Sequence, residues 1–310
     1  MNATWQSHLT EKLNQRRNQG LWRQRPLVTS HPTATKMQVN GHWIVNFASN
    51  DYLGLASDKS IADEALQLNQ TAGSAGSTAS HLLAGHHLPH HLLEDELADW
   101  LGVERAILFS SGYLANLAVQ TALLSSEDWV IHDKLNHASL IDGAQLSTAN
   151  FKRYPHLDMS ALERRLEQQS SGLSMIVSDG VFSMDGDQAP LATLSHLANV
   201  HQSLLVIDEA HAFGVLGKSG KGTFDHQNVS ITDNLLRVGT LGKAFASSGA
   251  FIAGNQLLID AIMQFARPYI YTTAQPPYQA SFSRVALKRV IAGDHKRAHL
   301  QTLIQFFQHE

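Results

Sequence analysis

The 310-residue chain contains no cysteine. That absence excludes a disulfide framework, a thiolate nucleophile and a cysteine-ligated metal, and it fits a reducing compartment such as the cytoplasm. The chain also lacks an excess of basic residues, because 23 Lys and Arg stand against 27 Asp and Glu. Without a basic field, binding to a nucleic-acid backbone is not expected, and chemistry on a small molecule becomes the default.

A long apolar run is missing as well. The first 19 residues are polar and have no apolar core of the kind found in a signal peptide. The most apolar later stretch, 245–263, carries Asn255 and Asp260 and is interrupted by glycine and serine, so it is too polar to span a membrane. The sequence therefore predicts a cytoplasmic protein with no membrane partner.

From Pro89 onward, short apolar runs alternate with amphipathic segments. Strands are predicted at 106–109, 129–132, 175–178, 204–208, 235–239 and 250–253, and helices at 89–101, 114–124, 140–146, 159–166 and 277–310. This alternation favours an α/β fold with a mostly parallel central sheet and helices on both faces. We expect an N-terminal arm with a small sheet element over 1–56, a large cofactor domain over 57–275, and the start of a C-terminal helical segment over 276–310.

The last predicted helix reaches Glu310 without a cap, a turn or a closing strand. An amphipathic helix needs a neighbouring element to cover its apolar side. The expectation is therefore that the C-terminal domain is truncated.

Polar residues follow four of the predicted strands. Ligands of open α/β sheets bind outside the carboxyl ends of the strands, where these residues would converge. They are Gly112 and Tyr113, Ser183 to Asp187, Asp208 to His211, and Thr240 to Lys243.

These positions suit pyridoxal phosphate (PLP). Asp208 can keep the ring nitrogen protonated, and Lys243 can supply the amine for a Schiff base. The serine- and glycine-containing turn at 110–113 offers backbone N–H donors to the phosphate, and Thr240 adds a hydroxyl. His137, beyond another strand end, is placed to stack on the ring. Singly, such residues are often caps or surface loops, but their order at successive strand ends favours a site.

Two nucleotide-binding alternatives fail on the sequence. Residues 208–211 spell the D-E-A-H box of helicases and ATPases, which requires G-x-x-x-x-G-K-[ST] before it. The nearest candidate, at 217–219, has Ala212 in place of the first glycine and follows the box. A dinucleotide enzyme needs G-x-G-x-x-G, and no such run exists.

A metal site is a further alternative, because His86, His87, His90 and His91 flank a predicted helix start. Outer-shell carboxylates usually orient histidine ligands, and no acidic residue lies in that short turn. The pattern therefore favours a solvated helix N-terminus, and no metal is expected.

Six segments together resemble the α-oxoamine synthases, which are PLP-dependent enzymes of fold type I. The segments are 46–54, 112–113, 137–139, 180–187, 208–211 and 239–244. The resemblance spans nearly the whole chain. It implies that Lys243 holds PLP and later moves the α-proton of the amino acid, that Asp208 pairs with the ring nitrogen, that His211 and Ser183 contact the ring oxygen, and that His137 stacks on the ring face.

The resemblance also implies a phosphate site and a homodimer. Gly112, Tyr113 and Thr240 would take the phosphate of their own subunit. Thr272 or Thr273 would reach the phosphate of a neighbouring subunit, which places the active site at the subunit interface.

Within that family, segments 264–273 and 276–277 and the arginine-rich arm are similar to the member of biotin biosynthesis. The implied reaction is the decarboxylative condensation of L-alanine with a pimeloyl thioester of coenzyme A or a carrier protein. Asn50 would lie near the amino-acid carboxylate and Arg23 near the acyl donor. The alternatives are glycine with an acetyl or succinyl thioester, and a catalytically inactive PLP-fold partner protein.

The segment 73–78 departs from the family pattern. Ala75 stands where the family usually has glycine, and Thr78 where it often has arginine or glycine. The substrate contacts in this segment are therefore left unassigned. The resemblance implies a further C-terminal domain that carries substrate-binding residues, and we expect it to be missing from this chain.

Overall fold

The structure is a computed structural model that describes residues 1–70 and 74–309. It consists of two compact units, Met1–Ala48 and Ser49–Glu310. The sequence suggested a boundary near residue 56, and the division into an arm, a cofactor domain and a C-terminal segment stays a prediction. Gly73, the first residue of the divergent segment, lies outside the described residues.

The N-terminal unit contains one helix and a three-stranded antiparallel sheet. Helix α1 covers Ala3–Asn18, and the strands are β1 (Val28–Thr33), β2 (Lys36–Val39) and β3 (His42–Val45). The side chain of Asn2 accepts hydrogen bonds from the N–H groups of Thr4 and Trp5 and so caps α1. None of the residues of α1 is buried.

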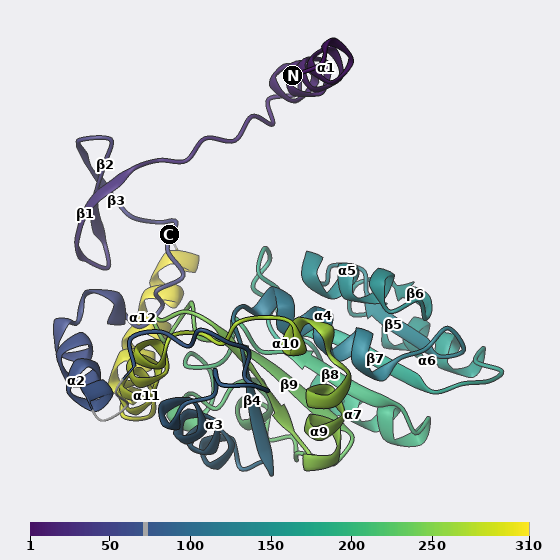
Figure 1. Cartoon of the computed structure of the whole chain (residues 1–310). Coiled ribbons are helices and arrows are strands. Elements are labelled where there is room, and N and C mark those ends of the chain that lie inside the picture. Colours follow the sequence, from purple (N-terminus) through teal and green to yellow (C-terminus); the bar gives the residue numbers. More distant parts are fainter. Residues whose placement is uncertain (71–73, 310) are drawn as a thin grey trace. The chain divides into compact units, whose positions relative to one another are not determined.

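The larger unit is built on a seven-stranded sheet of order β4-β10-β9-β8-β7-β5-β6 (Figure 1). The strands are β4 (Arg105–Phe109), β5 (Trp129–Asp133), β6 (Asn150–Tyr154), β7 (Ser174–Asp179), β8 (Leu204–Asp208), β9 (Leu235–Thr240) and β10 (Ala250–Gly254). Strand β10 runs antiparallel to both neighbours, and the remaining pairs are parallel. The predicted mostly parallel sheet is confirmed.

Helices cover both faces of this sheet (Figure 1). They are α2 (Lys59–Asn69), α3 (Leu88–Leu101), α4 (Gly112–Leu123), α5 (Ala138–Leu146), α6 (Met159–Glu167), α7 (Leu191–Val200), α8 (Thr223–His226), α9 (Gln256–Phe265), α10 (Arg267–Ile270), α11 (Pro277–Ile291) and α12 (Asp294–His309). Short 3₁₀ turns cover Leu55–Ser57 and Lys218–Gly220.

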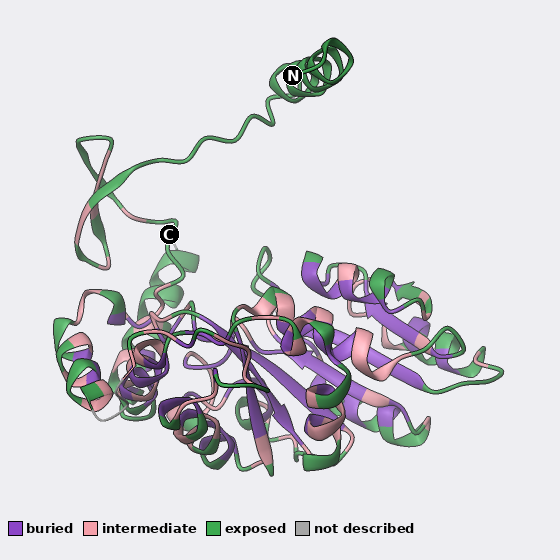
Figure 2. Ribbon diagram, viewed as in Figure 1, coloured by how far each residue is buried: buried purple, intermediate pink, exposed green. Residues whose placement is uncertain are grey.

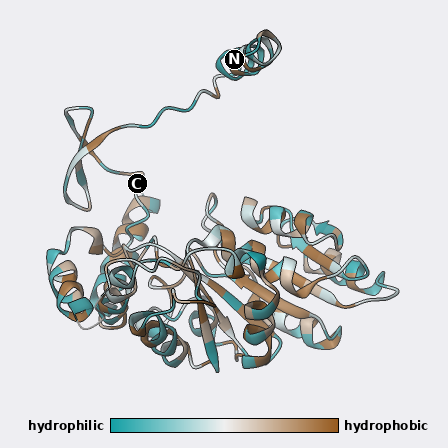
Figure 3. Ribbon diagram, viewed as in Figure 1, coloured by the Kyte–Doolittle hydropathy of each residue, from teal (hydrophilic) through white to brown (hydrophobic). Residues whose placement is uncertain are grey.

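Alternate residues of the strands enter different hydrophobic clusters. Ile107 and Val206 pack in one cluster with residues of α4, α5 and α9. Leu108 packs with residues of α2, α3 and α11, and Ile207 with residues of α6 and α7. The strands are buried and apolar along most of their length, as Figures 2 and 3 show. Their continuous apolar runs are what a sheet covered on both faces requires.

The structure corrects the predicted helix over 277–310, which is two helices, α11 and α12, separated at residues 292–293. The guanidinium of Arg297 explains the break. Its Nη1 donates to the carbonyls of Val290 (2.7 Å) and Gly214 (3.2 Å), so it satisfies a carbonyl at the end of α11. Strand β6 and helices α1, α2, α7, α8, α9 and α10 were not predicted.

Among the described residues, no helix combines the length and the apolar character needed to cross a membrane.

Candidate active site

A cavity of about 190 Å³ lies at the carboxyl edge of the large sheet. It is lined by Gly112, Tyr113, Asn116, His137, Ser139, Asp179, Asp208, Ala210, His211, Thr240 and Lys243. These residues lie at the ends of strands β7, β8 and β9, in the loops that follow β5, β8 and β9, and near the starts of α4 and α5. Three of the four polar groups expected at the strand ends therefore meet here, whereas the turn from Ser183 to Asp187 does not line the cavity. The chemical roles of the individual residues stay predictions.

The amine of Lys243 begins a chain of hydrogen bonds. Its Nζ lies 2.7 Å from Nε2 of His211, whose Nδ1 lies 2.7 Å from the hydroxyl oxygen of Tyr52. The Tyr52 hydroxyl donates to Oδ1 of Asn50 at 3.2 Å. All three bonds are satisfied if the Lys243 amine donates to His211, His211 donates to Tyr52, and Tyr52 donates to Asn50. This arrangement requires the Nδ1–H tautomer of His211. Asn50, predicted near the substrate carboxylate, is thus connected to the amine through Tyr52, which the sequence did not suggest.

The environment disfavours the protonated forms of both nitrogen bases. Burial lowers the pKa of Lys243, although Asp208 and Asp179 act in the opposite direction. Burial, and then the positive charge of Lys243, lowers the pKa of His211 to about 4. His211 is therefore neutral at pH 7 and can accept a hydrogen bond from the lysine amine.

Asp208 is buried at the end of β8, and both of its oxygens are held. Oδ2 accepts from Nδ2 of Asn116 at 2.7 Å, and Oδ1 accepts from the N–H of Ala210 at 2.9 Å. Nδ2 of Asn116 also donates to Oγ of Ser139 at 2.9 Å. Its Oδ1 is buried and has no hydrogen-bond partner among the described residues. The sequence missed Asn116, although its place one helical turn after Gly112 put it on the cavity side of α4.

A second buried carboxylate, Asp179, ends strand β7 beside Asp208 in the register of the sheet. Burial, followed by the negative charge of Asp208, raises the pKa of Asp179. One oxygen of Asp179 accepts the N–H of His137 at 2.8 Å and so fixes the start of α5. The sequence did not single out Asp179, because only the register of the sheet brings its carboxylate beside that of Asp208.

The N-terminus of α4 forms another side of the cavity. Oγ of Ser111 caps the helix by accepting from the N–H of Leu114 at 3.3 Å. A Cβ added at Gly112 would meet only the Cβ of Thr240, at 3.8 Å, so the backbone there is open. Oγ1 of Thr240 accepts from the N–H of Gly242 at 3.2 Å. An open helix N-terminus beside a hydroxyl suits an anionic group.

Several predicted residues do not line this cavity. Ser183 lies in an exposed turn after β7. Thr272 and Thr273 precede α11, and Thr273 forms an isolated antiparallel bridge with Ser80. Arg23 belongs to the N-terminal unit. The roles of these residues stay predictions.

Glu209, the second residue of the D-E-A-H segment, has a structural role. Its Oε1 accepts from Nη2 (2.8 Å) and Nε (3.2 Å) of Arg237, and both side chains are buried. The pair joins the end of β8 to β9. Removing one partner of such a pair leaves an uncompensated buried charge.

The prediction of a solvated helix N-terminus at 86–91 is wrong for His90, which is fully buried. His90 contacts His86 and also His81, which lies outside the histidine run. Burial lowers the pKa of His81 to about 3 and that of His90 to about 4. The ring of His81 also stacks on that of Tyr269, with ring centres 5.3 Å apart.

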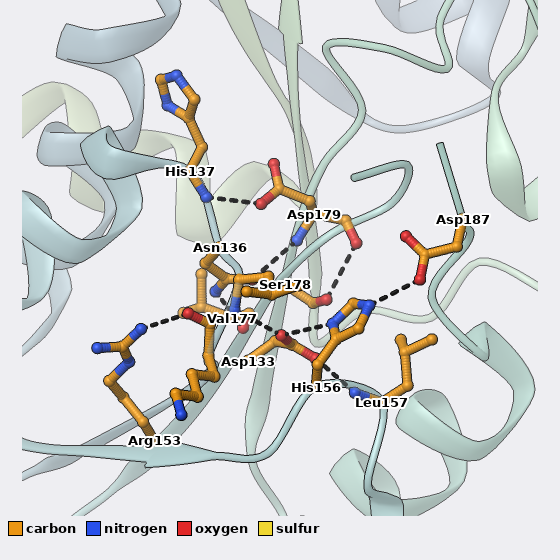
Figure 4. A network of polar contacts seen from close by, with 12 residues as sticks. Asp133, Asn136, His137, Arg153, His156, Leu157, Val177, Ser178, Asp179 and Asp187 are labelled. Carbon is orange, nitrogen blue, oxygen red and sulfur yellow. Dashed lines mark hydrogen bonds and ion pairs between the residues drawn. The ribbon is translucent and has the colours of Figure 1, made fainter. Parts of the chain in front are cut away.

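A separate bridge of three residues, Asp133, His156 and Asp187, lies at the same edge of the sheet and is called the His156 bridge here (Figure 4). Nδ1 of His156 is 2.9 Å from Oδ1 of Asp133, and Nε2 is 2.7 Å from Oδ2 of Asp187. Burial alone would lower the pKa of His156, but the two carboxylates outweigh it and raise the pKa. Asp187 closes the turn that carries Ser183.

A larger hollow, of about 590 Å³, lies at the opposite ends of β7 and β8. Its lining is mostly apolar, and Asp233 is the one titratable residue in it among those described. Volume would favour this hollow over the cavity at Lys243, but the convergence of groups with shifted pKa values selects the cavity at Lys243.

The model of the aminotransferase class I and II family matches residues 43–310. The chain belongs to this family. Its curated relatives include the 8-amino-7-oxononanoate synthase of Hydrogenovibrio crunogenus, 56% identical over 298 residues that cover 96% of this chain and 74% of that protein. The enzyme of the same name from Stutzerimonas stutzeri is 47% identical over 300 residues, which cover 97% and 76%.

Solved structures of the family agree. Serine palmitoyltransferase from S. paucimobilis superposes with a TM-score of 0.88 at 26% identity, over 97% of this chain and 76% of that one. The 8-amino-7-oxononanoate synthase of Francisella tularensis gives a TM-score of 0.73 at 36% identity, over 85% and 74%. The resemblance seen in the sequence and the fold type that it implied are confirmed.

Proposed function

We propose that the cavity at Lys243 binds PLP and that the enzyme condenses L-alanine with a pimeloyl thioester, releasing CO2 and forming 8-amino-7-oxononanoate. Curated relatives bearing the name of this synthase at 56% and 47% identity support the reaction. The observation that carries the proposal is the half-buried Lys243 amine, which shares one cavity with two strand-end carboxylates and an open helix N-terminus.

The residues of the cavity fit the cofactor. When bound, PLP acts as an electron sink that stabilises a carbanion at the amino-acid α-carbon. Asp208 would hold the proton of the ring nitrogen, and its contacts with Asn116 and Ala210 fix the carboxylate before the ring arrives. Within the described part of the chain, the buried Oδ1 of Asn116 has no hydrogen-bond partner, and a polar ligand in the cavity would supply one. Gly112 and Thr240 would receive the phosphate.

The same geometry supports proton movement at Lys243. An amine takes a proton only in its neutral form, and the lowered pKa of Lys243 favours that form. The bonds to His211 and, beyond it, Tyr52 hold the amine in place. We infer that Lys243 removes the α-proton of alanine and that Asn50, at the end of this chain of bonds, lies near the alanine carboxylate.

The remaining assignments are part of the proposal. The enzyme would be a homodimer, with Thr272 or Thr273 reaching the phosphate in the neighbouring subunit. Ser183 would contact the ring oxygen, His137 the ring face, and Arg23 the acyl donor. The acyl carrier is left as either coenzyme A or a carrier protein. The cytoplasmic location predicted from the sequence stays a prediction.

The proposal is tested by absorbance spectra of the full chain with PLP, then with L-alanine, then with pimeloyl-CoA, together with mass detection of the product. Wild type and a Lys134→Ala control, altered at an exposed lysine, should show a visible cofactor band that alanine changes. Lys243→Ala should lack that band.

Identical spectra for wild type and Lys243→Ala would refute the assignment of the lysine. A response to glycine and acetyl- or succinyl-CoA, with none to alanine, would favour the alternative substrates. A band that no amino acid changes, together with no product, would favour the inactive partner protein.

A further inference from the structure

Three histidines outside the Lys243 cavity bring their ring nitrogens together. His81 and His86 lie in the loop before α3, and His90 lies in the first turn of that helix. One ligand atom from each lies within 4.8 Å of the others. Nδ1 of His81 is 2.9 Å from Nδ1 of His86. At that distance the two nitrogens share one proton between two lone pairs, which is also how two ligands of a single cation are arranged.

His90 has the outer contact expected of a metal ligand. Its Nε2 lies 2.7 Å from the carbonyl oxygen of Gln275, which places the proton on Nε2 and leaves the lone pair on Nδ1. That lone pair accepts the N–H of His87 at 3.0 Å. A cation bound at Nδ1 would replace this single, neutral hydrogen bond.

The carboxyl group of Glu94 stands beside the ring of His86, and burial raises the pKa of this carboxyl group to about 8. Oε1 of Glu94 is held by the N–H of Leu108 at 2.9 Å, and Oε2 lies 3.9 Å from Nε2 of His86. A cavity of about 250 Å³ opens at His81, His86 and Glu94 and leaves room for an ion and a water molecule. Arg105 also lines this cavity, but its charge is paired with Asp260 at 2.5 Å.

We propose that His81, His86 and His90 bind one divalent cation of the zinc type, with a water molecule as the fourth ligand and Glu94 as the outer-shell partner at Nε2 of His86. Imidazole suits Zn²⁺, Co²⁺, Ni²⁺ and Cu²⁺ better than Mg²⁺ or Ca²⁺. Zn–N bonds of about 2.0–2.1 Å put tetrahedral ligand atoms about 3.3 Å apart. The rings therefore need only small movements to reach that arrangement.

The site would fasten the loop before α3 to the segment before α11. Thr273 pairs with Ser80, and the N–H of Ala274 donates to the carbonyl of Ala79 at 2.9 Å. The carbonyl of Gln275 receives both His90 and the hydroxyl of Ser77. The bound cation thus has a structural role, since it holds a segment that carries Thr272 and Thr273 without taking part in the chemistry at Lys243.

The test uses the tag-free full chain, stripped of metal with a chelator and titrated with Zn²⁺ against a chromophoric competitor. His86→Gln and His81→Gln remove ligands from half-buried positions, whereas His90 is too deeply buried for a clean substitution. His91→Gln is the matched control, because His91 is a largely exposed neighbour that pairs with Asp95.

Wild type and His91→Gln should bind one equivalent of Zn²⁺ and give the visible absorption of tetrahedral Co²⁺. His86→Gln and His81→Gln should bind Zn²⁺ at least roughly 10–100-fold more weakly than wild type. Loss of an outer-shell partner already costs that much, and these variants lose a direct ligand. The proposal is overturned if wild type shows no equimolar phase, or if His86→Gln binds as wild type does.

Discussion

The Lys243 cavity and the His156 bridge lie at the carboxyl ends of neighbouring strands, yet their charges are balanced in opposite ways. In the cavity, burial lowers the pKa of Lys243, and burial beside Asp208 raises that of Asp179. In the bridge, one imidazole has a carboxylate at each nitrogen, and its pKa is raised.

The difference separates a binding site from a structural contact. Groups held away from their preferred charge state contribute little to folding and gain from a ligand that completes their contacts. Groups with full partners stabilise the fold and have little to offer a ligand. The two kinds of cluster contain the same residue types, so composition alone does not distinguish them.

The largest loss of activity is expected from a substitution in the Lys243 cavity. Asp208→Asn keeps the shape of the side chain but removes the charge proposed to face the cofactor ring. Turnover should fall by at least about 10²-fold, as when a preorganised charge-stabilising group is lost. The measurement is kcat for product formation by the PLP-loaded enzyme. Asp63→Asn, at an exposed position of α2, is the control, and equal losses in both variants would contradict the assignment.

His156→Gln should act mainly on stability. The substitution removes two charge-assisted hydrogen bonds and leaves the fully buried carboxylate of Asp133 without its cation. The free energy of unfolding should fall by about 2 kcal/mol, measured by urea denaturation. Turnover should fall less than in Asp208→Asn. His226→Gln, at an exposed site, should leave the urea midpoint unchanged. A variant as stable as wild type would show that the bridge is dispensable.

Asp179→Asn should have a smaller effect, of the opposite sign. The raised pKa of Asp179 means that its charged form is disfavoured in the folded protein at neutral pH. The amide oxygen can still accept the N–H of His137, so the cofactor-free variant should be more stable than wild type by about 1 kcal/mol. Urea denaturation without PLP measures this, and destabilisation would place Asp179 with the structural residues.

The pH dependence of stability gives the finest distinction. The folded-state pKa of His156 is raised above its ordinary value of 6.5. Its contribution is therefore complete below pH 6.5 and is lost as the pH rises through the folded-state value. Wild type should lose stability over that range relative to His156→Gln, measured by urea midpoints at several pH values. Parallel curves for the two proteins would rule out this contribution.

The sequence predicted the parts of the site that depend on chain order. Asp208 and Lys243 follow apolar strands, and the carboxyl ends of such strands meet whatever the packing of the side chains. Asn116 and Tyr52 could not be recognised in the same way, because their roles come from the direction of one side chain relative to another element. The interpretation of the histidine run at 86–91 also left out His81, because the loop that brings His81 to His86 has no periodic pattern.

The sequence does contain a local signal for the break between α11 and α12. Gly293 interrupts the pattern, and a Cβ there would lie 3.0 Å from the carbonyl oxygen of Arg289. The contact of Arg297 with the carbonyl of Gly214 joins residues far apart in the chain, and local sequence does not encode it.

The place of β10 between β4 and β9 has a consequence for synthesis of the protein. Among the described strands, β4 pairs with β10 alone, through contacts such as Ile107 with Ile252. During synthesis on the ribosome, β4 is made before the other strands of the large sheet, and its partner β10 is made after all of them. Such long-range pairing slows folding and leaves an apolar edge exposed to other chains in the meantime. Helix α4, whose first residue lines the cavity, follows this strand, so the cofactor site is completed only at the last strand of the sheet.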